Sequence, residues 1–307
     1  MIGTSDKADL RLVWAIRATA AALGLALVCL GVFFYTRYAH ASVSVVDRDT
    51  QAIESEIRQH PDDPGLRVAA ANLYVAKGRS DLAVVQAEQV LKADPENLGA
   101  ILALADARAA LGQRDLAAIQ LKHAVELNKD NPMSGASLQL ALVHHKLGKI
   151  YLEQGMAAEA VAEFERALAI DPSNADSLYL MGKALAAQGK VDDAIDSYRR
   201  ALRLVPDFPE VYNELYRAYE TKGDLAHADA VWGLVRFSAG ETDQALEILE
   251  KSARAGTDMV EVHLGLAMIY EKKGDTARAL AEYRQALTMD ASSVAARQGI
   301  GRMGGQP

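Results

Sequence analysis

The chain has 307 residues, of which 50% are hydrophobic, 24% charged and 6% aromatic. A formal net charge of −8 argues against nucleic acid as a partner, because proteins that neutralise phosphates carry an excess of lysine and arginine. The single cysteine, Cys29, excludes an intramolecular disulfide, a zinc site built from several cysteines and an attached c-type haem.

The first predicted element is a transmembrane helix. Residues 18–36, ATAAALGLALVCLGVFFYT, contain no charge and as a helix would span roughly 28 Å, close to the hydrocarbon core of a bilayer at about 30 Å. We expect a short cytoplasmic segment at 1–17 and an uncleaved signal-anchor helix at 18–37. The alternative is a removed signal peptide ending at the A-x-A sequence of residues 39–41, which would be unusually long.

Basic residues around this span indicate its orientation. Three precede it and two follow it: Lys7, Arg11, Arg17, Arg37 and Arg48. Because basic residues favour the cytoplasmic side, we expect a single-pass protein of the inner membrane with a cytoplasmic N-terminus. The remainder, joined by a short linker at 38–46, is then periplasmic or extracytoplasmic.

Regularly spaced glycines follow the linker, within amphipathic patterns that predict an all-α region. Their intervals are 34, 43, 34, 34, 17 and 34 residues, for Gly78, Gly112, Gly155, Gly189, Gly223, Gly240 and Gly274. Each glycine lies between two helical stretches. Because glycine tolerates the left-handed conformation that ends a helix, the pattern predicts a series of tight helix–turn–helix units.

Small residues recur in register with these glycines. Five residues after six of them stands an alanine: Ala83, Ala117, Ala160, Ala194, Ala245 and Ala279. Seven residues before the same six stands an alanine or a glycine: Ala71, Ala105, Gly148, Gly182, Gly233 and Ala267. Two helices can nest closely only where such side chains are small. With its 34-residue period, this region resembles the tetratricopeptide repeat (TPR) family.

The resemblance implies a right-handed superhelix of helical hairpins over residues 47–304. Full repeats are expected at 64–97, 98–131, 141–174, 175–208, 226–259 and 260–293, half repeats at 46–63 and 209–225, and a capping helix at 294–303. Residues 132–140 are additional, and we expect them to lengthen the first helix of the third repeat. The helix around 226–238 is expected to serve two successive hairpins, which could bend or reset the superhelix.

Catalytic motifs are not found in the sequence. It has no phosphate-binding loop, nucleophile elbow, zinc-protease helix or haem attachment sequence. His144 and His145 are adjacent, and neighbouring helical positions point about 100° apart, so the pair cannot bind one metal without further ligands. We therefore predict a protein that is not an enzyme and that uses no cofactor or metal.

The TPR resemblance also places a binding surface. In this family the second, fifth, sixth, ninth, twelfth and thirteenth residues of the first helices line a concave groove. The ninth residues here are Asn72, Asp106, Lys149, Lys183 and Arg217. The groove residues predicted to bind a partner are Asn72, His145, Lys146, Lys149, Tyr179, Lys183, Asn213 and Arg217.

Four of these residues form a basic series along the groove of an otherwise acidic domain. Such a surface would attract an acidic or C-terminal peptide segment. The alternative is a scatter of solvated charges, since acids lie nearby: Glu153, Asp176, Glu210, Glu214 and Glu220. The last third of the groove is more apolar, and its residues could hold a partner helix or, as we expect, be covered by packing: Leu234, Phe237, Leu264 and Met268.

Together these features predict a membrane-tethered scaffold for protein–protein interaction. Its expected role is to hold protein partners during assembly of an envelope or membrane complex, without catalysis. The alternative is a stably bound accessory subunit of an integral-membrane complex, for example in electron transfer or secretion. In that case the small residues Ala20 and Gly24 could place the transmembrane helix itself in an interface.

Overall fold

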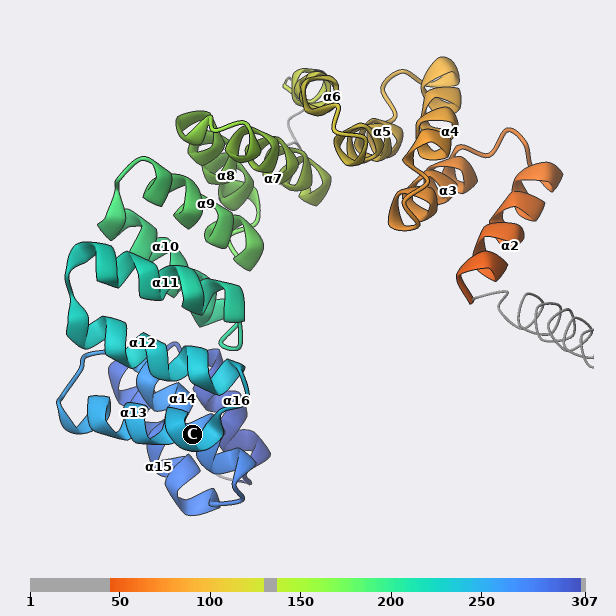
Figure 1. The fold of residues 1–307 in the computed structure, drawn as a ribbon. Coiled ribbons are helices and arrows are strands. Elements are labelled where there is room, and N and C mark those ends of the chain that lie inside the picture. Colours follow the sequence, from red (N-terminus) through yellow and green to blue (C-terminus); the bar gives the residue numbers. More distant parts are fainter. Residues whose placement is uncertain (1–44, 130–136, 305–307) are drawn as a thin grey trace, which may run out of the picture.

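The computed structural model describes residues 45–129 and 137–304 (Figure 1). Over these ranges the chain forms fifteen α-helices and no strand. The helices are α2 (Val45–Gln59), α3 (Pro64–Ala76), α4 (Ser80–Ala93), α5 (Leu98–Ala110), α6 (Arg114–Leu127), α7 (Leu138–Glu153), α8 (Ala157–Ile170), α9 (Ala175–Ala187), α10 (Val191–Leu204), α11 (Pro209–Lys222), α12 (Leu225–Ser238), α13 (Thr242–Arg254), α14 (Val260–Lys272), α15 (Thr276–Met289) and α16 (Val294–Arg302). The predicted all-α solenoid is confirmed.

The predicted transmembrane helix at 18–37 lies outside the described residues and stays a prediction. Segment 1–17 and most of the linker at 38–46 also lie outside them, and α2 begins at Val45. Among the helices within residues 45–129 and 137–304, none is both long and apolar enough to cross a bilayer.

Two kinds of turn join the helices of the solenoid. All seven glycines of the sequence pattern have positive φ, between +71° and +84°, and each ends a helix at a tight turn. Several turns that lead into the next hairpin use a side-chain cap instead: Asn97 Oδ1 accepts from the Ala100 amide at 3.0 Å, and Asn174 Oδ1 accepts from Ser177 at 2.8 Å. These caps satisfy amides that the first turn of a helix leaves free.

The small residues lie where paired helices cross. The six alanines that follow the turn glycines are all fully buried. A Cβ atom added to Gly182 would lie 2.5 Å from Cε1 of the buried Tyr198, and one added to Gly148 would lie 2.9 Å from Cε1 of Phe164. The first helix therefore rests directly on an aromatic ring of the second, which a larger residue would prevent.

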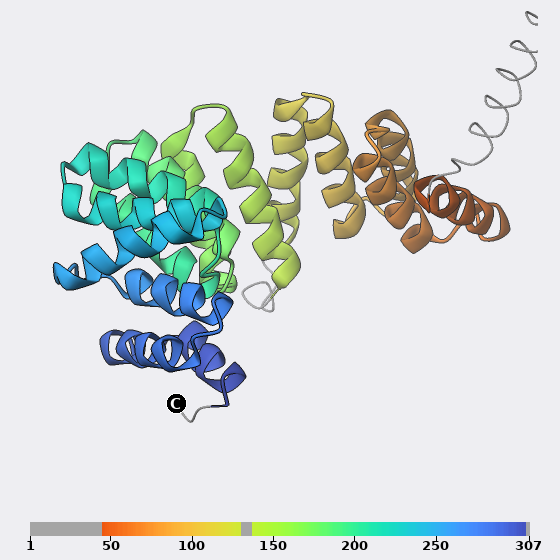
Figure 2. The same ribbon diagram turned by 60° about the horizontal axis from the view of Figure 1, so that its bottom comes forward.

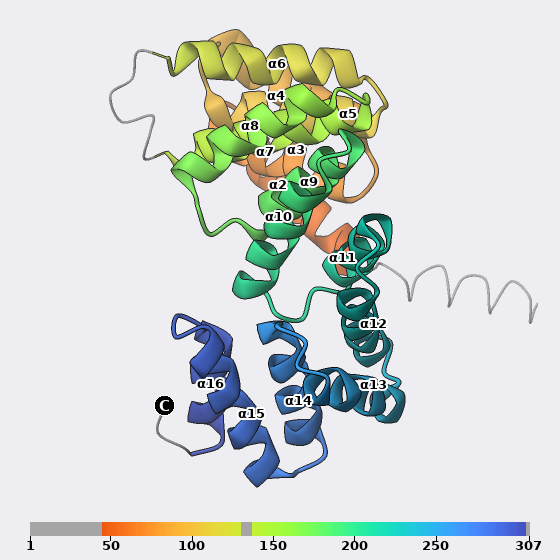
Figure 3. The same ribbon diagram turned by 90° about the vertical axis from the view of Figure 1, so that its left-hand side faces the viewer.

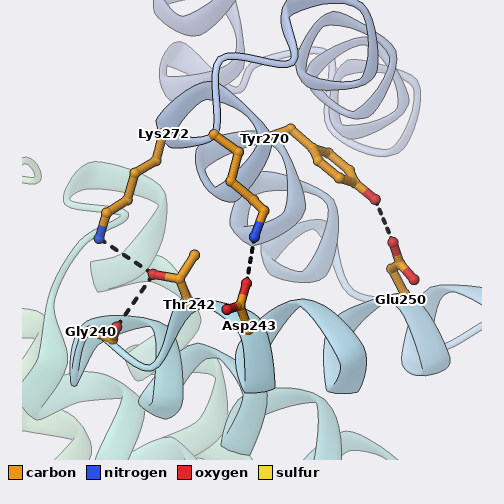
Figure 4. Close-up of polar contacts among 7 residues, drawn as sticks. Gly240, Thr242, Asp243, Glu250, Tyr270 and Lys272 are labelled. Carbon is orange, nitrogen blue, oxygen red and sulfur yellow. Dashed lines mark hydrogen bonds and ion pairs between the residues drawn. The ribbon is translucent and has the colours of Figure 1, made fainter.

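Helix α2 packs against the first hairpin at the place where a second helix would lie. It packs on α3 through a hydrogen bond of 2.7 Å from the Tyr74 hydroxyl to Glu54. The same contact joins α14 to α13, where the Tyr270 hydroxyl donates to Glu250 at 2.7 Å (Figure 4). Helix α2 thus covers the first hairpin in the manner of a terminal cap.

The regular alternation of helices shifts at α12. This helix is bounded by the turn glycines Gly223 and Gly240, and it packs against both α11 and α13. It is the second helix of one hairpin and the first helix of the next. The first helices of the hairpins are therefore odd-numbered up to α11 (α3, α5, α7, α9 and α11) and even-numbered from α12 onward (α12, α14 and α16).

The shift accompanies a change in overall shape. Helices α2 to α9 form an open arc, and α12 to α16 turn back beneath it (Figures 1 and 2). Buried apolar side chains form one cluster over α3 to α5 and a second, larger one from α5 to α16. The core is therefore distributed along the helical pairs, with no single centre.

Candidate functional site

Two adjoining hollows lie between the first helices α3, α5 and α7. Their volumes are about 450 Å³ and about 550 Å³, and they share Val75, Asp106, Leu142 and Lys146. Most of their lining residues stand at the groove positions that the TPR resemblance names. Of the predicted partner-binding residues, the hollows contain Asn72, His145, Lys146 and Lys149.

The walls of the hollows are largely apolar. Leu142 reaches into both and keeps 41% of its surface exposed. Val75 and Ala109 contribute further apolar surface from α3 and α5. A concave apolar wall of this kind suits the side chains of a bound segment.

Lys146 does not offer a free charge to this surface. Its Nζ lies 2.7 Å from Oδ1 of Asp106 on the neighbouring first helix. Lys149 is exposed and lines the hollow of about 450 Å³. It forms no hydrogen bond or ion pair with any described residue. At the far end, Arg114 and Glu153 pair at 2.7 Å, so Lys149 is the uncompensated cation among the described lining residues.

His145 is held in place rather than free in the groove. Its Nδ1 lies 2.8 Å from the Ser177 hydroxyl, and its ring meets the edge of Phe164 at 6.0 Å between centroids. Burial lowers the pKa of His145 below its ordinary value. The imidazole is therefore neutral at physiological pH, and it joins α7 to the start of α9 as a polar packing group.

Tyr179 and Lys183 on α9 lie outside the two hollows. The Tyr179 ring packs near Phe208 and Tyr198, at centroid distances of 5.4 and 6.3 Å. Lys183 places its Nζ 5.5 Å from the centre of the Tyr179 ring, within range of a cation–π contact. Both side chains are half-buried.

Asn213 and Arg217 on α11 also lie outside the hollows and make contacts within their own helix. The Asn213 amide donates to the Pro209 carbonyl at 2.9 Å, and Arg217 Nη1 lies 3.3 Å from Glu214. The Arg217 side chain is 70% exposed, so its ion pair is a weak surface pair. The basic series predicted along the groove thus contains one neutralised member, Lys146, and one partly neutralised member, Arg217.

Among the lining residues that were not predicted to bind a partner are three that both hollows share: Val75, Asp106 and Leu142. All three stand at groove positions, the twelfth, ninth and second of their helices. The groove positions of the TPR family identify all three. They were not predicted to bind a partner because the prediction favoured basic and hydrogen-bonding side chains over apolar ones and over the acid that pairs with Lys146.

The apolar residues predicted for the last third of the groove are used in packing. Leu234 is fully buried against Gly265 of α14. Leu264 and Met268 line a cavity of about 250 Å³ that α16 and the end of α10 enclose. Within the described ranges, no group of three or more His, Cys, Asp or Glu side chains is placed to hold a metal ion.

Comparison with known proteins agrees with this architecture. A family model described as the tetratricopeptide repeat matches residues 68–132, 145–209 and 230–294, which is more than half of the chain. Curated proteins give no match. Among solved structures, TPR-like repeats of a kinesin light chain from Podosopora anserina align with a TM-score of 0.51 and 24% identity, covering 59% of this chain and 98% of that one.

Two further solved structures are similar over much of the chain. A structure of MamA aligns with 27% identity and a TM-score of 0.46, covering 62% of this chain and 94% of its own. The Cut9–Hcn1 structure of the APC/C aligns with 17% identity and a TM-score of 0.49, covering 84% of this chain and 46% of that one. On the family match, this chain belongs to the tetratricopeptide repeat family.

Proposed function

We propose that the chain is a membrane-tethered scaffold that binds a segment of a partner protein in the concave groove of α3, α5 and α7. TPR proteins are generally non-enzymatic scaffolds for protein–protein interaction, and this chain has their fold. The observation that supports the site is the pair of adjoining hollows with Leu142 exposed between them.

The lining indicates the chemistry of the bound segment. Leu142 and Val75 would contact one or two apolar side chains of the partner. Lys149 would pair with an acidic side chain or a terminal carboxylate beside them. Because Asp106 already neutralises Lys146, a single carboxylate matches the groove better than a run of acids.

The tether is the apolar segment at 18–37, and it would place the repeats on the outer face of the inner membrane. The support is the uncharged run of residues 18–36 and the basic residues before it. A scaffold in this position would hold partners during assembly of an envelope or membrane complex. Protease protection in spheroplasts tests the orientation: external protease should digest the repeats, and their resistance would contradict it.

Partner capture by variants of the full-length chain tests the groove. Leu142→Glu and Lys149→Glu should each reduce recovery of crosslinked partners at least about fivefold, because they alter a wall and the uncompensated cation. The control is Lys92→Glu, an exposed lysine of α4 outside both hollows. The double variant Lys183→Glu with Arg217→Glu extends the test to α9 and α11.

Recovery from these variants shows whether the partner binds the groove of α3, α5 and α7 and whether it also contacts α9 and α11. Loss with Leu142→Glu and Lys149→Glu alone supports the groove as described, and additional loss with the α9–α11 double variant extends it along the basic series. Equal recovery from the groove variants and from Lys92→Glu, with helix content unchanged, would remove the proposal.

A further inference from the structure

The hairpins after α12 have their own concave groove, formed by the same positions as the first. Counted from the start of each first helix, the second, fifth and ninth residues are Glu261, Leu264 and Met268 in α14, and Ala295, Gln298 and Arg302 in α16. All except Glu261 line the cavity of about 250 Å³. The equivalent positions in α3, α5 and α7 line the two hollows of the first groove.

This second groove is covered by the protein's own chain. The remaining walls of the cavity include Leu204, Pro206 and Asp207, from the end of α10 and the segment that leads to α11. Helix α10 contacts α16 directly although about ninety residues separate them. Figure 3 shows the end of α10 approaching the ends of α14 and α16.

The covering segment is the end of α10 and the short connection to α11. Helix α10 continues to Leu204, the backbone is extended at Val205, with φ and ψ of −129° and 90°, and it bends at Pro206. The buried Tyr212 hydroxyl donates to the Pro206 carbonyl, which fixes the segment against α11. An apolar residue, a proline and an acid are thus presented to the groove: Leu204, Pro206 and Asp207.

One ion pair anchors this contact. Arg199 Nε on α10 lies 3.2 Å from Oε1 of Glu261, whose side chain is only 8% exposed. The other oxygen of Glu261 is buried and accepts no hydrogen bond from any residue that the structure describes. Since a buried carboxylate depends strongly on its partner, Arg199 is the group whose removal would most disturb the closed groove.

The rest of the hairpin unit is braced separately, so it does not need the covering segment to keep its shape. Lys272 and Lys273 of α14 reach Thr242 and Asp243 at the start of α13 (Figure 4). Arg302 of α16 donates to both carboxylate oxygens of Glu271 at 2.9 Å. None of these contacts uses a residue of α10, so they would persist if α10 moved away.

We propose that α12–α16 form a second peptide-binding groove, kept closed by residues 199–207 of the same chain acting as an internal ligand. A segment with the same features, a basic residue followed by an apolar residue, proline and aspartate, displaces it and opens the C-terminal hairpins. This goes beyond the proposed function, because it concerns a different surface.

The test uses the full-length chain and a labelled peptide with the sequence of residues 199–207, RRALRLVPD. In the variant Arg199→Glu, the internal segment carries a charge that Glu261 repels, whereas the added peptide retains its arginine. We expect the peptide to bind this variant at least about tenfold more tightly than it binds the wild type. The variant's radius of gyration, measured by small-angle X-ray scattering, should be larger than that of the wild type.

Arg200→Glu is the matched control. Arg200 is the next residue on α10, and its nearest acid, Asp196 on the same helix, lies 4.0 Å away. This variant should resemble the wild type in both measurements. Unchanged peptide affinity and radius in a folded Arg199→Glu variant would overturn the proposal, because the contact would then be ordinary core packing.

A second measurement covers the case in which Arg199→Glu does not fold. In a chain with Cys29→Ser, the exposed residues Leu204 and Val294, which both line the cavity, are replaced by cysteine and joined with a short bifunctional thiol reagent. We expect crosslinking without peptide, and a rate at least about twofold lower with millimolar peptide. A rate that peptide does not change would contradict displacement of the internal segment.

Discussion

The close nesting of paired helices can be tested by adding one methyl group at Gly182. The Cβ atom of an alanine there would lie 2.5 Å from Cε1 and 2.7 Å from Cδ1 of Tyr198, distances that carbon atoms do not tolerate. Tyr198 is only 1% exposed, so its ring cannot move into solvent. The Gly182→Ala variant must therefore shift either the ring or the helix.

Two terms of opposite sign set the size of the effect. Overpacking a core costs about 1–3 kcal/mol, whereas alanine in place of glycine within a helix gains about 1 kcal/mol. The expected net result is a decrease in the free energy of unfolding of about 1 kcal/mol. Gly301→Ala is the control, because that helical glycine has no atom within 4 Å of the added Cβ, and this change should stabilise the protein slightly.

Urea denaturation followed by circular dichroism measures both variants. Because repeat proteins can unfold in parts, hydrogen exchange of α9 and α10 shows whether the loss is local to the altered pair. If Gly182→Ala were as stable as Gly301→Ala, α9 and α10 would not approach as closely as described, and the packing argument would fail.

Two further predictions concern charge and pH. Asp106→Ala removes the partner of Lys146. A segment with an acidic residue should then bind the groove about two- to fivefold more tightly at low salt, as measured by titration calorimetry. Weaker binding would mean that Asp106 itself contacts the partner. Burial and the hydrogen bond to Glu54 raise the pKa of Tyr74 to about 12 from its ordinary value of 10. The neutral hydroxyl thus stabilises the fold below pH 10, and this contribution is lost as pH rises toward 12, because the unfolded chain ionises first. Between about pH 9 and about pH 11, the free energy of unfolding measured by urea titration should therefore decrease less for Tyr74→Phe than for the wild type. Equal decreases would contradict a raised pKa of Tyr74 in the folded protein.

Much of the fold could be predicted because it depends on local and periodic features. The turn glycines need positive φ, and the buried alanines need close helix crossings, so each requirement leaves a mark at a fixed spacing in the sequence. The 17-residue interval between Gly223 and Gly240 likewise marks the helix that two hairpins share.

The positions of the groove residues could be predicted from the sequence, but the pairing of their charged side chains could not. The groove positions identify most residues of the hollows, yet the state of Lys146 depends on Asp106, which lies forty residues earlier and on another helix. A repeat pattern places both residues on the concave side without saying which side chains meet. Exposed apolar walls such as Leu142 have the same sequence signature as core residues, so only the packed structure separates them.

The contact between α10 and the C-terminal hairpins could not be predicted for a different reason. Its ion pair joins Arg199 to Glu261, sixty-two residues apart, and depends on the angle at which the hairpins after α12 turn back. That angle results from many small packing contacts. Neither residue departs from an ordinary helical pattern in the sequence.

Site-specific photo-crosslinking tests the central claim, that a partner segment binds the groove of α3, α5 and α7. A photoreactive residue replaces either Leu142, 41% exposed in the groove, or Leu116, 42% exposed on α6 and outside both hollows. The full-length chain is then crosslinked in its native membranes. We predict a discrete protein adduct from position 142 and none of that mass from position 116. Equal adducts from both positions, or an adduct from position 116 alone, would contradict the account.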